Sequence, residues 1–225
     1  SMNPRMLVGD IVAEGMLAQG MGDRTGRQRR VAELLEQVGL RADAASRYPH
    51  EFSGGQRQRI CVARALAVEP QLIVCDEPTS ALDVSVQAQI LNLLKSLQRQ
   101  LGLSYFFITH NISVVAYLAD EVAVMYLGRI VEQGRVDEVL EAPAHPYTQA
   151  LLSAVPVPDP QRQRSVIRLE GDMPSPSDPP AGCHFHPRCP EAMAHCQAAY
   201  PDSVSLSGSH RASCHLLATD AASHS

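Results

Sequence analysis

The sequence predicts an α/β domain with a largely parallel sheet, preceded by helices and followed by a cysteine-rich tail. Three observations lead to this prediction. Short apolar runs of strand length alternate with longer amphipathic segments, two glycines open a helix after a serine, and adjacent carboxylates end the first apolar run. The 225 residues are 45% hydrophobic, enough for one large domain or a medium domain with an appendage.

The first third of the chain has the pattern of helices. Val8 to Gln19 fits a first helix, and Thr25 to Leu40 fits a second, with apolar residues at helical spacing from Val31 to Val38. A serine and two glycines then open a third helix that runs to about Ala67. We therefore expect residues 1–67 to form a helical domain.

Strands and helices alternate in the next part of the chain. Leu72 to Cys75 is a continuous apolar run that ends in acidic residues, as a buried parallel strand does. A long amphipathic helix is expected from about Val84 to Leu101. The other expected elements are strands at Ser104–Ile108 and Val122–Tyr126, a hairpin turn at Gly128–Arg129 that leads into a strand at Ile130–Glu132, and helices at Ser113–Leu118, Val136–Glu141 and Tyr147–Ala154. We assign residues 68–154 to this α/β part.

Charge and hydropathy exclude some classes of protein. The formal net charge of -5 argues against a general nucleic-acid binder. The most apolar region, Leu101 to Leu127, is interrupted by polar and charged residues such as His110 and Asp120, so it is not a membrane span. No signal-peptide pattern is visible at the start. We expect a soluble protein whose contact with a membrane is peripheral.

The third helix begins within the segment Phe52-Ser53-Gly54-Gly55-Gln56-Arg57-Gln58-Arg59. Glycines at that position leave backbone N–H groups open to a phosphate, and the helix dipole adds partial positive charge at the same end. Taken alone, so short a motif is better explained by an ordinary serine N-cap followed by flexible glycines. A phosphate-binding role needs support from other motifs along the chain.

Adjacent carboxylates, Asp76 and Glu77, end the apolar run at 72–75 and precede Pro78-Thr79-Ser80-Ala81-Leu82-Asp83. The carboxyl ends of parallel strands are where α/β folds bind ligands. One carboxylate there can hold Mg²⁺ through water, and the next can orient or activate an attacking water. A charged strand end leading into a turn is the alternative, and it leaves the segment 78–83 unexplained.

Three segments in this order, FSGGQRQR, LIVCDEPTSALD and ITHN, resemble the nucleotide-binding domain of ABC transporters. They match its signature motif, its Walker B strand with the adjoining glutamate and D-loop, and its switch histidine. The resemblance covers about Ser1 to Leu152. It implies the P-loop-NTPase-like fold of that domain, with a helical subdomain that carries the signature motif.

The resemblance also implies a role for each matched residue. Asp76 would bind Mg²⁺ through water, Glu77 would be the general base or position the attacking water, and His110 would sense the γ-phosphate of ATP. Asp83 would close a D-loop that contacts an opposing subunit. The signature residues would clamp the ATP held by the other subunit of a head-to-tail pair; they are Ser53, Gly54, Gly55 and Gln56.

One feature of the ABC domain has no counterpart in these 225 residues. The phosphate-binding loop G-x-x-x-x-G-K-[ST] needs a Gly-Lys pair, and the only lysine, Lys95, comes directly after Leu94 inside an expected helix. Ser1 to Met6 resembles the stretch just after the family's glutamine loop. We therefore expect a domain truncated at its N-terminus, which by itself neither hydrolyses ATP nor binds it at micromolar affinity.

The last part of the chain narrows the resemblance. Tyr126–Glu132, Pro143–Leu152 and the segment GCHFHPRC at 182–189 resemble the oligopeptide, dipeptide and nickel importer ATPases. In that family the tail is the characteristic C-terminal extension. We expect it here at residues 155–225, beginning with a proline-rich connector from Val155 to Pro180.

Four cysteines of the tail have gaps of 5, 6 and 17 residues between them. Four thiolates suit a [4Fe–4S] cluster or tetrahedral Zn²⁺, and the resemblance implies the cluster, which some family members carry. The spacing lacks the C-x₂-C pairs of zinc ribbons, which favours [4Fe–4S]; unligated thiols are a third interpretation. The proposed ligands are Cys183, Cys189, Cys196 and Cys214. The histidines among them are expected to face solvent, with one able to substitute as a ligand: His184, His186, His195 and His215.

The sequence thus predicts an ATP-hydrolysing subunit that energises an importer for dipeptides or oligopeptides, bound peripherally at the cytoplasmic face of the cell membrane. Nickel or glutathione is the alternative cargo. The implied partners are a second ABC ATPase subunit, two transmembrane permeases and, indirectly, an extracytoplasmic substrate-binding protein. A non-transport ABC ATPase is disfavoured because neither a basic nucleic-acid surface nor a long coiled-coil insert is present. A stand-alone iron–sulfur or zinc module would leave the ATPase motifs unexplained.

Overall fold

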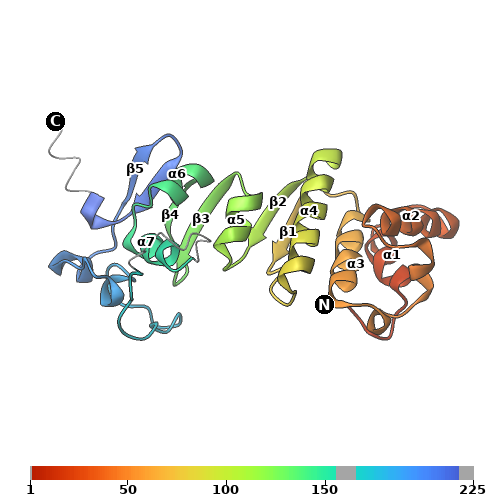
Figure 1. Ribbon diagram of the computed structural model, residues 1–225, viewed down its shortest axis with the longest axis horizontal. Coiled ribbons are helices and arrows are strands. Elements are labelled where there is room, and N and C mark those ends of the chain that lie inside the picture. The colour runs from red at the N-terminus through yellow and green to blue at the C-terminus, as the bar shows by residue number, and fades with distance from the viewer. Residues whose placement is uncertain (1, 156–165, 218–225) are drawn as a thin grey trace. The chain divides into compact units, whose positions relative to one another are not determined.

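The computed structural model describes residues 2–155 and 166–217, and they fall into two compact units that divide after His110 (Figure 1). Each unit has its own apolar core. Residues 156–165 of the expected connector lie outside the described residues. None of the helices within the described ranges is long and apolar enough to cross a membrane.

Helices open the first unit, close to where the sequence predicts them. They are α1 (Val8–Ala18), α2 (Arg24–Gln37) and α3 (Gly54–Leu66), with two 3₁₀ turns, η1 (Ala42–Ser46) and η2 (Pro49–Glu51), between the last two. Asp23 caps α2 by accepting the N–H of Gly26 at 2.7 Å. The apolar faces of the three helices form one buried core, to which Leu34 and Ile60 contribute with no exposed surface.

A parallel strand–helix–strand unit completes the first unit. Its elements are β1 (Leu72–Asp76), α4 (Val84–Leu101) and β2 (Ser104–Ile108). The strands pair in parallel and in register, from Leu72 opposite Ser104 to Asp76 opposite Ile108. Helix α4 buries Ile90, Leu94 and Leu97 in the same core as the first three helices. The carboxyl ends of the two strands therefore lie side by side.

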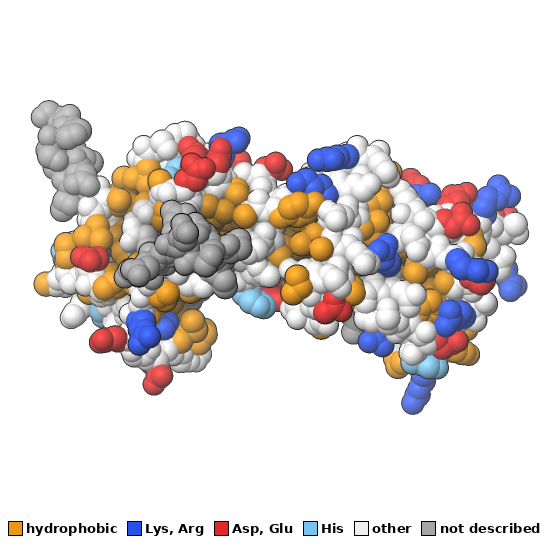
Figure 2. Space-filling view, in the orientation of Figure 1, with side chains coloured by type: hydrophobic (Ala, Val, Ile, Leu, Met, Phe, Trp, Pro, Cys, Tyr) orange, Lys and Arg blue, Asp and Glu red, His pale blue; other side chains and the backbone are white. Residues whose placement is uncertain are grey.

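One face of the β1–β2 pair is apolar and open. Leu72 and Val74 are 55% and 62% exposed, and Phe106 and Ile108 of the neighbouring strand are 60% and 44% exposed. Apolar side chains lie on the surface around these strands in Figure 2. Large apolar patches on a sheet face mark places where another layer of structure packs.

The second unit contains a four-stranded antiparallel sheet with the strand order β3-β4-β6-β5. The strands are β3 (Glu121–Tyr126), β4 (Arg129–Arg135), β5 (Ser203–Ser207) and β6 (His210–Ser213); the helices are α5 (Ile112–Leu118), α6 (Val136–Glu141) and α7 (Pro146–Ser153). Two more 3₁₀ turns, η3 (His186–Arg188) and η4 (Ala194–Gln197), lie in the tail.

This sheet differs from the largely parallel sheet that the sequence predicts. Among the described strands only β1 and β2 pair in parallel. A tight turn at Leu127 and Gly128, with φ of 43° and 77°, folds β4 back against β3. The far edge of β4 is then taken by β6 from the tail, a segment that shows no strand pattern in the sequence.

Aromatic rings tie the tail to the rest of the second unit. Phe185 is 1% exposed, and its ring centroid lies 5.2 Å from Tyr126 on β3 and 5.4 Å from Tyr147 on α7. The two tyrosine rings meet edge to face at 4.7 Å. Such aromatic pairs contribute about 0.5–1.5 kcal/mol each beyond their burial. The segment after Gly182 is thereby anchored on β3 and α7.

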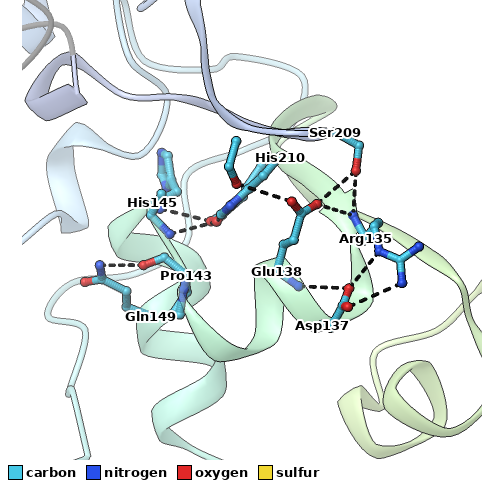
Figure 3. A network of polar contacts seen from close by, with 11 residues as sticks. Arg135, Asp137, Glu138, Pro143, His145, Gln149, Ser209 and His210 are labelled. Atoms are coloured by element: carbon cyan, nitrogen blue, oxygen red, sulfur yellow. Dashed lines mark hydrogen bonds and ion pairs between the residues drawn. The ribbon is translucent and has the colours of Figure 1, made fainter.

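A network of polar contacts makes a second connection, and Figure 3 shows His145, His210, Glu138 and Ser209 within it. Glu132 of β4 is 1% exposed and accepts hydrogen bonds from Ala144 N–H at 2.7 Å, from His145 N–H at 2.9 Å and from His210 Nε2 at 2.7 Å. Close by, Glu138 accepts from the hydroxyls of Ser207 and Ser209. Both carboxylates thus join the tail hairpin to β4 and α6.

His145 makes the stability of the second unit depend on pH. Burial lowers the pKa of His145 to about 4, and its Nδ1 accepts the Tyr147 N–H at 3.0 Å as the N-cap of α7. The unfolded chain takes up this proton near pH 6.5, whereas the folded chain does so only near pH 4. Stability is therefore lost as the pH falls through that window, by about 3 kcal/mol for this group.

We predict that His145→Asn weakens this pH dependence, because asparagine can cap α7 without titrating. Thermal unfolding followed by circular dichroism from pH 7 to pH 4 should show a steeper loss of stability for the wild type than for the variant. His50→Asn, at an exposed position of the first unit, serves as the control and should behave as the wild type. Equal pH profiles for wild type and His145→Asn would contradict the assignment.

Candidate active site

The joint end of β1 and β2 brings two of the predicted catalytic residues into contact. Glu77 comes directly after β1, His110 lies just beyond β2, and Glu77 Oε1 lies 2.8 Å from His110 Nδ1. The Glu77 side chain is 38% exposed and the His110 side chain 78% exposed. Asp76, the last residue of β1, is also exposed. A carboxylate oriented by an imidazole and open to solvent can position a water and accept its proton.

Backbone geometry fixes the position of Glu77. Its φ is 48°, in the left-handed region that residues other than glycine seldom adopt. The Glu77 N–H donates to the carbonyl of Ile108 at 2.9 Å, which continues the β1–β2 pairing by one residue. The Glu77 carbonyl accepts from the hydroxyl of Ser80 at 3.1 Å. The strained backbone is thus held from both sides, which turns the carboxylate towards His110.

The serine–glycine segment opens α3 as a capping box. The Ser53 hydroxyl accepts the N–H of Gln56, and the Gln56 side chain accepts the N–H of Ser53. Ser53 and Gln56 are exposed, whereas Gly55 is buried. The turn therefore presents the positive end of a helix to solvent, as the sequence predicts.

Asp83 caps the next helix. Its carboxylate accepts from the Ser85 hydroxyl at 2.7 Å and from the Val86 N–H at 2.9 Å, and these bonds lower its pKa. A Cβ on Gly54 would lie 3.4 Å from Leu82, and one on Gly55 would clash with Val86. The start of α3 thus packs on the start of α4. Two segments far apart in the sequence, 53–56 and 82–86, lie together.

The four cysteines of the tail lie in one region of the second unit. The Cys183 N–H donates to the carbonyl of Cys196 at 2.8 Å, and Cys183 and Cys189 pack against the aromatic cluster around Phe185. Burial raises the pKa of the thiols of Cys183 and Cys214, and that of Cys189 to about 11.

Two family matches cover separate parts of the chain. Residues 1–80 match the family described as ABC transporter, and residues 131–196 match the family described as Oligopeptide/dipeptide transporter, C-terminal region. A protein of Brucella ovis described as a peptide import ATP-binding protein, BOV_A0347, is 50% identical over 214 residues, which are 95% of this chain and 68% of that protein. The chain belongs to the ATP-binding proteins of ABC transporters. The predicted family is confirmed.

Similarity to other ABC proteins supports the same family. The oligopeptide transport ATP-binding protein OppF of Escherichia coli is 51% identical over 223 residues, 98% of this chain and 66% of OppF. The dimeric ATP-binding cassette MJ0796, solved in a post-hydrolysis state with ADP and Pi, is 29% identical with a TM-score of 0.53 over 60% of this chain and 59% of that chain. The α/β fold of the ABC nucleotide-binding domain is thereby confirmed. The chain spans 64% to 68% of the length of the curated relatives that it matches.

The iron–sulfur assignment for the tail is wrong. The ABC transporter family match and the descriptions of the curated relatives support ATP binding and peptide transport but no such cofactor. Among the residues that the structure describes, the group whose possible ligand atoms all lie within 4.8 Å of one another is His195, Cys196 and His215. A set of two imidazoles and one thiol differs chemically from the four thiolates on which the [4Fe–4S] prediction depended.

Sequence reasoning missed the polar residues that organise the second unit. Glu132 stands next to Val131 within a strand-like run, and that position in an apolar strand is the signal that could have marked it as buried. His145 and His210 carried no such signal, because nothing in the sequence shows that β6 pairs with β4. The contact between the rings of His195 and His215 likewise carried no sequence signal.

We predict that Gly55→Ala destabilises the first unit by about 1–3 kcal/mol, because the added methyl overpacks against the stiff side chain of Val86. Val86→Ala should relieve part of this cost, so that the double variant is more stable than additivity allows. Urea unfolding of the two single variants and the double variant measures the coupling. Gly54→Ala is the matched control, since its methyl meets only ordinary contact. If the changes in unfolding free energy of Gly55→Ala and Val86→Ala simply add in the double variant, the predicted contact between the two side chains is contradicted.

Proposed function

We propose that this chain carries the ATP-hydrolysing machinery of a subunit that energises the import of peptides. The observation that carries the proposal is the 2.8 Å contact between Glu77 and His110 at the joint end of two parallel strands, in a chain that belongs to the ABC ATP-binding proteins. The phosphate-binding loop, which these 225 residues do not contain, would be supplied by the complete subunit. Without it, the 225 residues alone neither bind ATP tightly nor hydrolyse it.

Each residue at this end of the sheet has a chemistry that suits the proposal. Asp76 offers an exposed carboxylate oxygen, the kind of ligand that Mg²⁺ prefers. Mg²⁺ held there supplies charge neutralisation for phosphate oxygens. Glu77 orients the attacking water and accepts its proton, and His110 holds the carboxylate in place and reaches towards the γ-phosphate. The strain at Glu77 keeps this arrangement preformed.

The signature turn serves a nucleotide held by a second ATPase subunit. Ser53 to Gln56 lies at the N-terminus of α3, where the helix dipole adds partial positive charge, and Asp83 lies at the start of the adjacent helix α4. The neighbour MJ0796 is a dimer with ADP and Pi, which supports a pair of ATPase subunits. Because the two segments pack together, closure on ATP would move 53–56 and 82–86 as one body.

The same proposal gives each remaining part of the chain a role. Residues 1–67 form the helical domain that receives the two permeases, residues 68–154 carry catalysis, and residues 155–225 form the extension of the peptide importers. The family match at 131–196 supports the last assignment. The subunit would be peripheral, at the cytoplasmic face of the membrane, with a substrate-binding protein on the opposite side.

A chimera tests the function. In OppF, the 223 matched residues are replaced by the corresponding residues of this chain, and the chimera is expressed with the OppF partners. We predict ATP hydrolysis and uptake of labelled oligopeptide. Glu77→Gln should lower kcat by about 10²–10⁴-fold with little change in ATP binding, because it removes the group that accepts the proton. His110→Ala should lower kcat as well.

Glu121→Gln, on the exposed side of β3, is the matched control and should leave hydrolysis unchanged. A chimera that folds and binds ATP yet keeps full turnover with Gln at position 77 would overturn the assignment of Glu77. A chimera that hydrolyses ATP without importing peptide would contradict the assignment of peptide as the cargo, while the assignment of ATP hydrolysis would stand.

A further inference from the structure

An arginine on α3 reaches across to the end of α2. Arg59 donates through Nη1 to the carbonyl of Val38 at 2.6 Å, in a partly buried hydrogen bond. Val38 is the C-cap of α2, and its carbonyl is among the last of that helix, which the amides of the helix itself cannot satisfy. The two helices lie side by side in Figure 1. The bond therefore joins the end of one helix to the body of the other.

The charge of Arg59 suits the end of α2. The last turn of α2, all of it within the described residues, contains no basic residue, while Glu33 and Glu36 stand near that end. The C-terminus of a helix carries partial negative charge, and a cation that donates to its last carbonyls is stabilising there. Arg59 supplies such a cation from a different helix, the one that begins at the signature turn, residues 53–56.

Gly39 leaves room for the guanidinium. Its φ is 78°, and a Cβ at this position would lie 2.9 Å from Arg59 Nη1. Glycine adopts this left-handed conformation without strain at the end of a helix. Because Gly39 has no side chain, the arginine can reach the carbonyl of Val38 next to it. The chain after α2 is thus shaped to receive Arg59.

The same helix carries the signature turn. Arg59 follows Ser53 by six positions, which is less than two turns of helix. Beside it, Ile60 is fully buried in the core of the first unit. At the first turn of the helix, Gly55 packs closely on Val86 of α4. The start of α3 is therefore supported by α4 at Gly55 and by α2 at Arg59.

We propose that Arg59 is a positioning residue for ATP hydrolysis, which holds the signature turn in place by tying α3 to the end of α2. The proposal rests on the proposed function, in which the turn at 53–56 serves a nucleotide held by a second subunit. Arg59 acts through the turn and not on the nucleotide itself. A movement of α2, in the domain proposed to receive the permeases, passes to the turn through the bond between Arg59 and Val38.

Hydrogen exchange in the chain tests the positioning directly. The N–H groups of Gln56 and Arg57 donate to the hydroxyl and the carbonyl of Ser53, so their exchange rates report on the turn. Arg59→Met keeps the aliphatic stem but removes the donors, and it should speed exchange at both amides by about 10-fold or more. Arg59→Lys keeps one charged donor and should restore most of the protection. Circular dichroism checks that both variants keep their helices.

The same variants in the OppF chimera test the consequence for hydrolysis. Arg59→Met should lower kcat by roughly 5- to 20-fold, less than the about 10²-fold that a misplacement of about 1 Å can cost. The equilibrium affinity for ATP should change little, because the turn serves the nucleotide of the other subunit. Arg59→Lys should recover most of the turnover.

Arg27→Met is the matched control. Arg27 Nη1 donates to the carbonyl of Gly22 at 2.6 Å, a bond of the same kind and length in the same domain, but both of its ends lie outside α3. This variant should leave turnover and the exchange at Gln56 and Arg57 unchanged.

The outcomes separate this proposal from the proposed function. Unchanged exchange at the turn in Arg59→Met overturns the role of Arg59, whether or not the chimera is active. So does full turnover of Arg59→Met in an active chimera, or an equally large effect of Arg27→Met. A chimera without any hydrolysis contradicts the proposed function instead, and the exchange rates then decide whether Arg59 positions the turn.

Discussion

The in-register pairing of β1 with β2 is the constraint on which the active site depends. Because the strands are parallel and end opposite each other, the residues after them, Glu77 and His110, meet although 33 positions separate them. The hydrogen bond from Glu77 N–H to Ile108 extends the pairing beyond the strand and sets the strained φ of Glu77. A slip of one residue would turn Glu77 to the other face of the sheet and break the contact.

In the second unit a buried charge has the corresponding role. Glu132 gathers the loop before α7 and the hairpin of the tail around one carboxylate. Unpaired, a buried carboxylate is costly; with three donors it becomes a specific connection. The segment His145-Pro146-Tyr147 takes part in the same connection. The His145 N–H donates to Glu132, and the ring of Tyr147 packs against that of Phe185. These residues hold the extension in place.

Much of the first unit can be predicted from the sequence. Periodicity and caps give α1 to α4 nearly to the residue, and the carboxylates after β1 mark the site, because these signals are local. The hairpin of β3 and β4 can be predicted from its turn, but the rest of the antiparallel sheet cannot, because β5 and β6 are short polar strands and only the fold shows that β6 pairs with β4 and β5 with β6. The cysteine spacing was misleading in a similar way, because gaps in the sequence do not show that His195, Cys196 and His215 lie close together in the folded chain.

The open face of Leu72, Val74, Phe106 and Ile108 has a practical consequence. Within the described residues each of the two strands has a neighbour on one side only, so unpaired backbone groups and uncovered apolar side chains occur together. That combination favours strand-to-strand association between molecules. Concentrated solutions of the 225 residues by themselves should therefore self-associate through β1 and β2, and should bind dyes that fluoresce on apolar surfaces.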